Sequence, residues 1–291
     1  KSTIGARSDI ENVDIGRLQA FYRTYYQPDN AVLIVAGKFD PAATLGLIAK
    51  YFGPIPKPSR ALPRIYTQEP VQDGERSAIL RRVGNAKYVG LMYHGVRGAH
   101  PDYVATDVLG EVMTLAPAGR LYKALVDTKK ATSVQSWIQP QADPGTITFF
   151  AQVPEADPLE PVRDTLFTVL GDVAKNPITE AEVARVRAKA AKYFEETINN
   201  PEAFGVAISE SIALGDWRLF FLQRDAYRTV KPADVQRVAL DYLKRTNVTI
   251  GEFVPDARPD RAPPPPTVDV AALVKDYKGD VAAAAGETFD P

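Results

Sequence analysis

The chain has 291 residues, of which 45% are hydrophobic and 24% charged, so it is long enough to build one large domain or two unequal ones around a buried core. Its 35 basic and 36 acidic side chains nearly balance, which excludes an overall electrostatic attraction to nucleic acid or to an anionic membrane. The absence of cysteine excludes disulfides, thiolate nucleophiles and cysteine-ligated zinc, and no segment approaches the roughly 20 apolar residues of a membrane span.

The first part of the chain predicts two helices separated by a strand. Apolar side chains recur at three- and four-residue spacing over 14–26, which is typical of an amphipathic helix. Residues 31–36, AVLIVA, form a short β-branched run that predicts a strand buried on both faces. Asp40 is a suitable N-cap and Pro41 suits the first helical position, so a second helix is predicted from there to about Phe52.

Five prolines between residues 54 and 72 predict an extended connector, and we place a domain boundary at 59–72. Beyond it, the pattern predicts two β-hairpins with two helices between them. These elements are the strands 77–83 and 87–94 with a turn at Gly84 and Asn85, the helices 101–113 and 119–128, and the strands 131–139 and 146–153.

Residues 159–244 are almost wholly helical in pattern. Thr179 and Glu182 have the spacing of a capping box, which opens a long helix ending near Ile198. Residues 247–254 supply one more strand. The order of these elements predicts an α+β fold, in which an antiparallel sheet is flanked by helices. The predicted breaks between the helices lie near residues 176–177, 199–201, 215 and 231–232.

The composition changes after residue 254. The run PDARPDRAPPPP predicts a stiff, extended strap that cannot join a sheet. A short helix is predicted over 268–277, followed by an irregular tail over 282–291. The chain starts at Lys1 with neither Met nor a leader peptide, so we expect it to be trimmed from a longer protein.

The two histidines, His94 and His100, are the first candidates for a metal site. Their six-residue separation does not fit one helical face, where ligand pairs lie three or four residues apart. We favour the alternative that His94 ends a strand and His100 lies in the loop before Pro101. The sequence also lacks H-x-x-E-H, G-x-S-x-G and the glycine-rich phosphate-binding motifs. We therefore predict neither catalytic nor metal-binding residues in this chain, and no cofactor of its own.

The stretch 119–123, GRLYK, is the one candidate for substrate contact. It opens a predicted helix after Pro117, so its first amides and basic side chains could meet an anion or a peptide carboxylate. On this basis we name Arg120 and Tyr122 as candidate substrate-contact residues. The ordinary alternative, a helix start with a solvent-facing arginine, is favoured by the residues alone.

Several linked segments resemble the pitrilysin/insulysin family of zinc metallopeptidases, the inverted zincins. They are LQAFYRTYYQPDNAVLIVAGKFDP, YHGVRGAHPDYVATDVLGEVM and GRLYKALVDTKKATSV, in the family's order and spacing. The resemblance implies the rear part of a first peptidase-like domain at 1–58, a complete inactive peptidase-like domain at 73–255 and a proline-rich strap between halves at 256–291.

The family's functional residues do not carry over. Its H-x-x-E-H helix is absent, so zinc is expected in a missing N-terminal domain of the parent protein. The family also uses an arginine and a tyrosine, in a pattern like LREEKGLAY, to hold the substrate. The comparable stretch here, LVDTKKATS, has Val126 and Ser133 at those two positions, which implies that this domain lacks that role as well.

The resemblance implies a non-catalytic domain of a zinc metalloendopeptidase, which forms part of the peptide-binding chamber. Its partners would then be the remaining peptidase domains or a catalytic subunit, together with peptide substrates, and its compartment would be the periplasm. One alternative is a structural scaffold or assembly subunit similar to the non-proteolytic core proteins of respiratory complexes. A second is an unrelated ligand-binding α+β protein.

Overall fold

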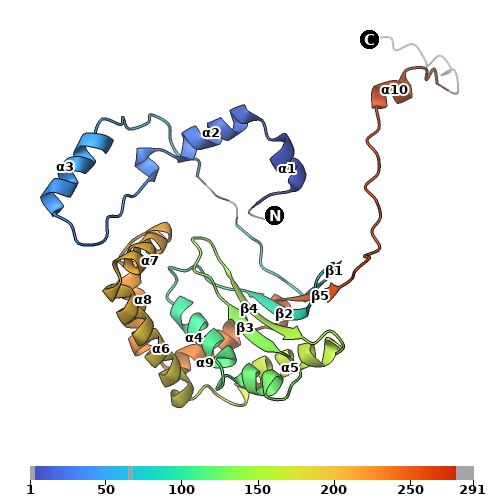
Figure 1. The fold of residues 1–291 in the computed structure, drawn as a ribbon. Helices are drawn as coiled ribbons and strands as arrows, with labels where there is room; N and C mark the ends of the chain where they lie inside the picture. The colour runs from blue at the N-terminus through green and yellow to red at the C-terminus, as the bar shows by residue number, and fades with distance from the viewer. Residues whose placement is uncertain (1–3, 65, 67, 280–291) are drawn as a thin grey trace, which may run out of the picture.

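A five-stranded sheet organises the central part of the chain. The computed structural model describes residues 4–64, 66 and 68–279. In the described residues the sheet has the order β1-β5-β2-β4-β3 (Figure 1). Its strands are β1 (Arg76–Arg82), β2 (Lys87–His94), β3 (Ser133–Trp137), β4 (Thr146–Val153) and β5 (Val248–Pro255).

The predicted hairpin between β3 and β4 is confirmed, but the one between β1 and β2 is wrong. Strand β5 lies between those two strands, antiparallel to β2 and parallel to β1. The reason is burial: β2 turns Val89, Leu91 and Tyr93 inward, with at most 2% exposure, and needs buried neighbours on both sides. Strand β5 offers Val248 and Ile250, whereas every residue of β1 is exposed. The fold class is confirmed, with one parallel pair at the edge of an otherwise antiparallel sheet.

Helices cover one face of this sheet (Figure 1). Helices α4 and α5 contact the strands directly, and α9 packs beside α4. Leu109 of α4 and Leu166 of α5 meet Leu91 and Phe149 of the sheet in one core, and all four side chains are fully buried. Burial of each contributes roughly 1.5–3 kcal/mol. The helices are α4 (Tyr103–Thr114), α5 (Glu160–Gly171), α6 (Glu180–Asn199), α7 (Pro201–Ala213), α8 (Leu219–Thr229) and α9 (Pro232–Tyr242).

Glycine permits the close contact between α4 and the sheet. A Cβ atom on Gly110 would lie 2.8 Å from Ile138 Cδ1 and 2.9 Å from Ser136 Oγ. Any larger residue at this position would push the helix away from β3. The side of α4 that faces away from the sheet packs against α6 and α8.

The predicted helix starts and breaks in this region are largely confirmed. Thr179 Oγ1 accepts a hydrogen bond from Glu182 N, and Glu182 Oε2 accepts one from Thr179 N, which completes the predicted capping box of α6. Asn200 then ends α6 and caps α7. The predicted helix over 119–128 is present as a shorter helical segment over 120–126, of which Tyr122–Val126 is wound as a π-helix.

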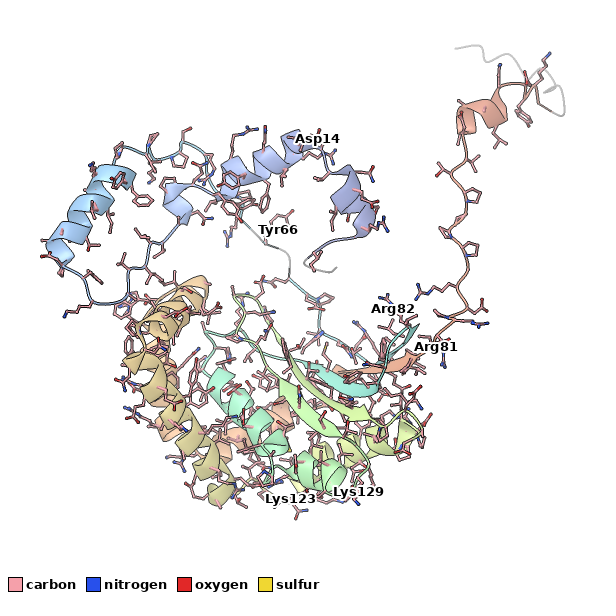
Figure 2. All side chains as sticks on the ribbon, in the orientation of Figure 1. Asp14, Tyr66, Arg81, Arg82, Lys123 and Lys129 are labelled. Carbon is pink, nitrogen blue, oxygen red and sulfur yellow. The ribbon has the colours of Figure 1, made fainter. Side chains whose placement is uncertain are left out.

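The three N-terminal helices, α1 (Arg7–Asn12), α2 (Ile15–Tyr25) and α3 (Pro41–Phe52), are exposed, and none of them contains a buried residue. Of these, α2 and α3 form as predicted and α1 was not predicted. The carboxylate of Asp14, labelled in Figure 2, caps α2 by accepting a hydrogen bond from Arg17 N at 3.0 Å. The predicted N-cap of α3 is likewise confirmed, because Asp40 Oδ1 accepts from Ala43 N at 2.9 Å.

The predicted strand at 31–36 is wrong. A strand buried on both faces needs a neighbour on each side, and no described segment pairs with this one. Val32, Leu33 and Val35 are exposed, while Ile34 packs against the aromatic cluster of α6, α7 and α8. The segment therefore lies across α7 as an extended, unpaired chain.

The connector and the strap are extended, as predicted. The Arg60 guanidinium donates two hydrogen bonds to the Asp29 carboxylate, at 2.7 and 2.9 Å, which fastens the connector to the turn after α2 and lowers the pKa of Asp29. The strap after Pro255 joins no sheet within the described residues, and α10 (Val270–Val274) lies inside the predicted helix 268–277. The irregular tail predicted at 282–291 lies outside the described residues.

Candidate ligand-binding site

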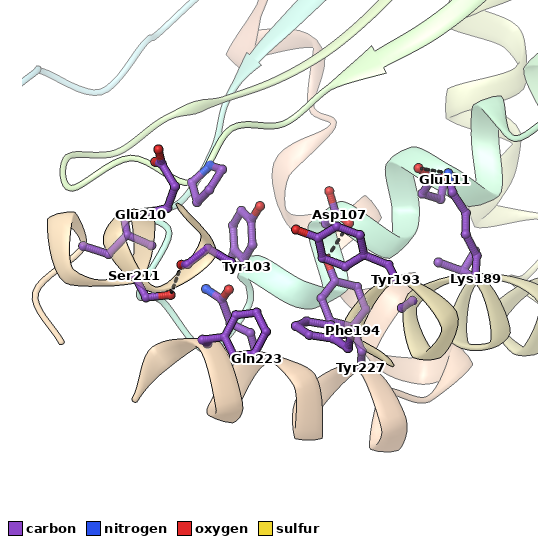
Figure 3. Close-up of a pocket in the computed structure, with 16 residues that line it drawn as sticks. Tyr103, Asp107, Glu111, Lys189, Tyr193, Phe194, Glu210, Ser211, Gln223 and Tyr227 are labelled. Atoms are coloured by element: carbon purple, nitrogen blue, oxygen red, sulfur yellow. Dashed lines mark hydrogen bonds and ion pairs between the residues drawn. The ribbon is translucent and has the colours of Figure 1, made fainter. Parts of the chain in front are cut away.

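A cavity of about 360 Å³ lies between α4, α6, α7 and α8. Figure 3 shows a polar row along it, from Glu210 and Ser211 at one end, through Asp107 in the middle, to Glu111 and Lys189 at the other end. Aromatic side chains supply much of the remaining lining. These are Tyr103, Tyr193, Phe194, Phe220 and Tyr227. A concave site that is mostly apolar, with a few polar groups facing inward, is typical of ligand pockets.

Helix α4 places three side chains along the cavity. Tyr103, Asp107 and Glu111 are spaced four residues apart, so they share one face of the helix. Tyr227 of α8 donates a hydrogen bond from its hydroxyl to Asp107 Oδ2 at 2.6 Å. Burial and the neighbouring carboxylate raise the pKa of Tyr227, so this hydroxyl keeps its proton and remains a donor.

The carboxyl group of Asp107 has a raised pKa. Burial raises the pKa of its carboxyl group, the hydrogen bond from Tyr227 opposes that rise, and the charge of Glu111 reinforces it. The positive charge of Lys189 has a smaller, opposing effect. A carboxyl group in this environment holds its proton more tightly than an ordinary aspartic acid does.

Lys189 of α6 closes one end of the cavity. Its Nζ atom lies 2.7 Å from both carboxylate oxygens of Glu111. Asp107 and Glu111 have the four-residue spacing at which one helix can offer two metal ligands, but the ammonium group already neutralises Glu111. Among the described residues, no group of three His, Cys, Asp or Glu side chains is placed to hold a metal ion. The residues of this part of the chain therefore do not fit a zinc site.

The histidines lie where the sequence placed them. His94 ends β2, with its Nε2 atom 3.5 Å from Glu69 Oε1. His100 precedes α4 in a loop, and its Nδ1 atom accepts a hydrogen bond from Asp102 N at 3.0 Å. The interpretation of both as a strand end and a loop residue is confirmed.

The candidate substrate-contact residues lie outside the cavity. The Arg120 guanidinium donates to both oxygens of Glu182, at 2.7 and 2.9 Å, and to the backbone carbonyls of Asn176 and Pro177. Arg120 thereby holds the segment that leads into α6. Tyr122 is half-buried and packs against the main core. A substrate-contact role for these two residues stays a prediction.

Sequence reasoning missed Asp107 and Tyr227. Asp107 lies within the mostly apolar run YVATDVLGEVM, four residues before Glu111, and a pair of acids at that spacing was a usable signal. Tyr227 gave none, because its contact with Asp107 spans 120 residues of sequence.

Comparison with known proteins identifies the family. A family model described as the peptidase M16 inactive domain matches residues 12–190, which is more than half of the chain. The chain belongs to the peptidase M16 inactive domain family. The resemblance to pitrilysin/insulysin peptidases is thereby confirmed.

Individual similar proteins support this family assignment. The zinc protease PqqE of Helicobacter pylori is 26% identical over 84% of this chain, and the chain spans 56% of that relative's length. A crystal structure of a protease from H. pylori has a TM-score of 0.81 at 26% identity, covering 87% of this chain and 62% of that one. The inactive peptidase domain of an inferred zinc protease from Bordetella parapertussis is 42% identical, with a TM-score of 0.57, over 63% of this chain and 98% of its own.

No helix among the described residues is long and apolar enough to cross a bilayer.

Proposed function

We propose that this chain is the non-catalytic part of a zinc metalloendopeptidase and that it forms one wall of a peptide-binding chamber. The match to the M16 inactive domain family carries the proposal. On the cavity-facing side of α4, Glu111 is paired with Lys189, which leaves Asp107 as the other carboxyl group of that face. The zinc ion and the catalytic residues would belong to another part of the parent protein.

Exposed apolar surface supports a multi-domain parent. Helices α2 and α3 expose Phe21, Tyr22, Leu45 and Leu47, each by more than half of its surface. Apolar surface of this extent is typical of a face that another domain covers. We assign residues 1–58 to the rear part of a first peptidase-like domain, 59–72 to a linker, 73–255 to the complete inactive domain and 256–291 to the strap between halves.

The open face of the sheet is a further candidate for the chamber wall. Tyr88 and Met92 of β2 are 37% and 43% exposed there, beside Phe150 and Phe253. A peptide in an extended conformation can lie on such a surface and bury its own apolar side chains. Arg120 and Tyr122 lie away from this face and remain separate candidates for substrate contact.

A reconstitution experiment tests the proposal. The purified chain, incubated with an unstructured peptide and Zn²⁺, should leave the peptide intact. The parent protein should cleave the same peptide in an EDTA-sensitive manner, and deletion of residues 73–255 should abolish that cleavage. EDTA-sensitive cleavage by the isolated chain, or undiminished cleavage after the deletion, would contradict the proposal.

The same experiment distinguishes the peptidase proposal from the alternative that the chain is a scaffold subunit. A scaffold subunit predicts a parent protein without peptidase activity, whatever its partner. The relatives described above are proteases or an inactive peptidase domain, which favours the peptidase. We propose the periplasm as the compartment on the family likeness, and cell fractionation of the source organism tests it.

A further inference from the structure

The cavity between α4, α6, α7 and α8 has an excess of negative charge. Three carboxylates line it, from Asp107, Glu111 and Glu210, against a single ammonium group, that of Lys189. Lys189 is engaged with Glu111, and Glu210 forms no ion pair with any residue that the structure describes. The cavity therefore favours a positively charged ligand.

Unused hydrogen-bond acceptors point to the same kind of ligand. Asp107 accepts the Tyr227 hydroxyl at Oδ2, whereas its Oδ1 atom accepts no hydrogen bond from the described residues. Gln223 donates its amide to the carbonyl of Gly98, at 3.0 Å, and its Oε1 atom is likewise without a described donor. An ammonium group carries three donors and no acceptor, so it suits a site that offers free acceptors.

The aromatic lining favours a cation on an alkyl chain. Phe194 and Phe220 are at least nine-tenths buried in the floor of the cavity, whereas Tyr193 is 56% exposed at its rim. Aromatic faces attract cations and also bury methylene groups. The volume of about 360 Å³ lies at the small end of the range for ligand pockets, which suits one long side chain and not a folded segment.

The geometry points to an alkylammonium group, in the form of a lysine side chain of a bound peptide, as the ligand of this cavity. The methylene stem would lie on the aromatic floor and the ammonium group would meet Asp107. A guanidinium group fits less well, because its strongest contact uses both oxygens of a carboxylate and Tyr227 already occupies one of them. The choice of a peptide as the source rests on the proposed function, whereas the preference for an alkylammonium group does not.

The protonation of Asp107 provides a second way to detect cation binding. Glu111 on its own helix, Lys189 on α6 and Tyr227 on α8 act directly on its carboxyl group, and Tyr103, Tyr193 and Glu210 are the other titratable groups that line the cavity. A bound cation stabilises the ionised carboxylate, so binding should strengthen as the pH rises and Asp107 loses its proton. Where Asp107 is protonated before binding, the complex should release a proton to the buffer.

Calorimetry on the whole chain tests the inference. The probe is the capped peptide Ala-Ala-Lys-Ala-Ala, and the matched control peptide has norleucine in place of lysine, which keeps the stem and removes the charge. We expect the lysine peptide to bind at least about tenfold more tightly. The apparent binding enthalpy should change with the ionisation enthalpy of the buffer. Equal binding of the two peptides would overturn the inference.

Matched variants assign the effect to the cavity. Asp107→Asn keeps the shape and the acceptor for Tyr227, and it should remove the preference for lysine over norleucine together with the buffer dependence. Glu155→Gln makes the same change of charge on an exposed loop residue and should leave both unchanged. Unaltered binding by a folded Asp107→Asn variant, with folding checked by circular dichroism, would refute the role of Asp107.

A third probe, n-butylammonium, tests whether the bound alkylammonium group must belong to a peptide. If it competes with the lysine peptide only at far higher concentration, the peptide source is supported. Equal affinity of the two would overturn the peptide source and leave the cation site standing. Loss of peptidase activity in the parent bears on the proposed function alone, because this binding assay needs no catalytic domain.

Discussion

Replacing Arg120 with methionine should lower the free energy of unfolding of this chain by about 2 kcal/mol. The side chains of Arg120 and Glu182 are only 18% and 15% exposed, and the guanidinium group forms hydrogen bonds with the carboxylate and with two backbone carbonyls. Methionine preserves the aliphatic stem. It leaves the Glu182 charge without its main partner at the start of α6.

The magnitude follows from the pKa of Glu182. Burial raises this pKa, but hydrogen bonds from Arg120 and Thr179 outweigh burial and bring it to about 2, against an ordinary value of 4.5. Each unit of pKa corresponds to about 1.4 kcal/mol, so the net lowering, in which burial opposes the hydrogen bonds, corresponds to about 3.5 kcal/mol, or about 3 kcal/mol once solvent screening of this partly exposed pair is allowed for. Thr179 keeps its part in the variant, which leaves about 2 kcal/mol for Arg120.

Urea denaturation at several pH values measures this effect. Because the folded-state pKa is lowered, the stabilisation is present above pH 4.5 and is lost as the pH falls through about 2. The difference between the wild type and Arg120→Met should therefore shrink over that interval. Arg185→Met, which removes an exposed arginine of α6, should change the free energy of unfolding by less than about 0.5 kcal/mol. An Arg120→Met variant as stable as this control at pH 7 would refute the reasoning.

Two further substitutions examine α4. Gly110→Ala places a methyl group 2.8 Å from Ile138 Cδ1, so strain should exceed the gain in helix propensity and lower the free energy of unfolding by about 1 kcal/mol in urea titrations; a more stable variant would contradict this. Tyr227→Phe removes the hydroxyl that lowers the pKa of Asp107, so that pKa should rise further in a ¹³C NMR titration of the carboxyl group. An unchanged or lower value would show that the hydrogen bond does not form in solution.

Local chemistry made the helices predictable. The caps at Asp14, Asp40 and Thr179 are encoded within three residues of the backbone amides that they bind, so the printed sequence is enough to find them. The prolines and glycines between the helices act over the same short range. The family resemblance rested on these same contiguous segments.

The pairing of strands that lie far apart in the sequence could not be predicted from local patterns. Strand β5 follows β1 by more than 160 residues and still lies beside it, and no local signal distinguishes that arrangement from a hairpin of β1 with β2. The apolar run at 31–36 has the composition of a buried strand, but its pairing depends on neighbours that the described residues do not supply. The cavity likewise draws on four helices, so a pattern along one helix could reveal Asp107 but not its partner.

The parallel pairing of β1 with β5 has a mechanical consequence. The connector joins the sheet at the start of β1 and the strap departs from the end of β5, so the two attachments lie at opposite ends of one edge, roughly 20 Å apart. A force that pulls the flanking segments apart would load these two strands in shear, so that all their interstrand bonds resist together instead of peeling one at a time. Tension transmitted between neighbouring domains would thus meet the domain along its stiffest direction.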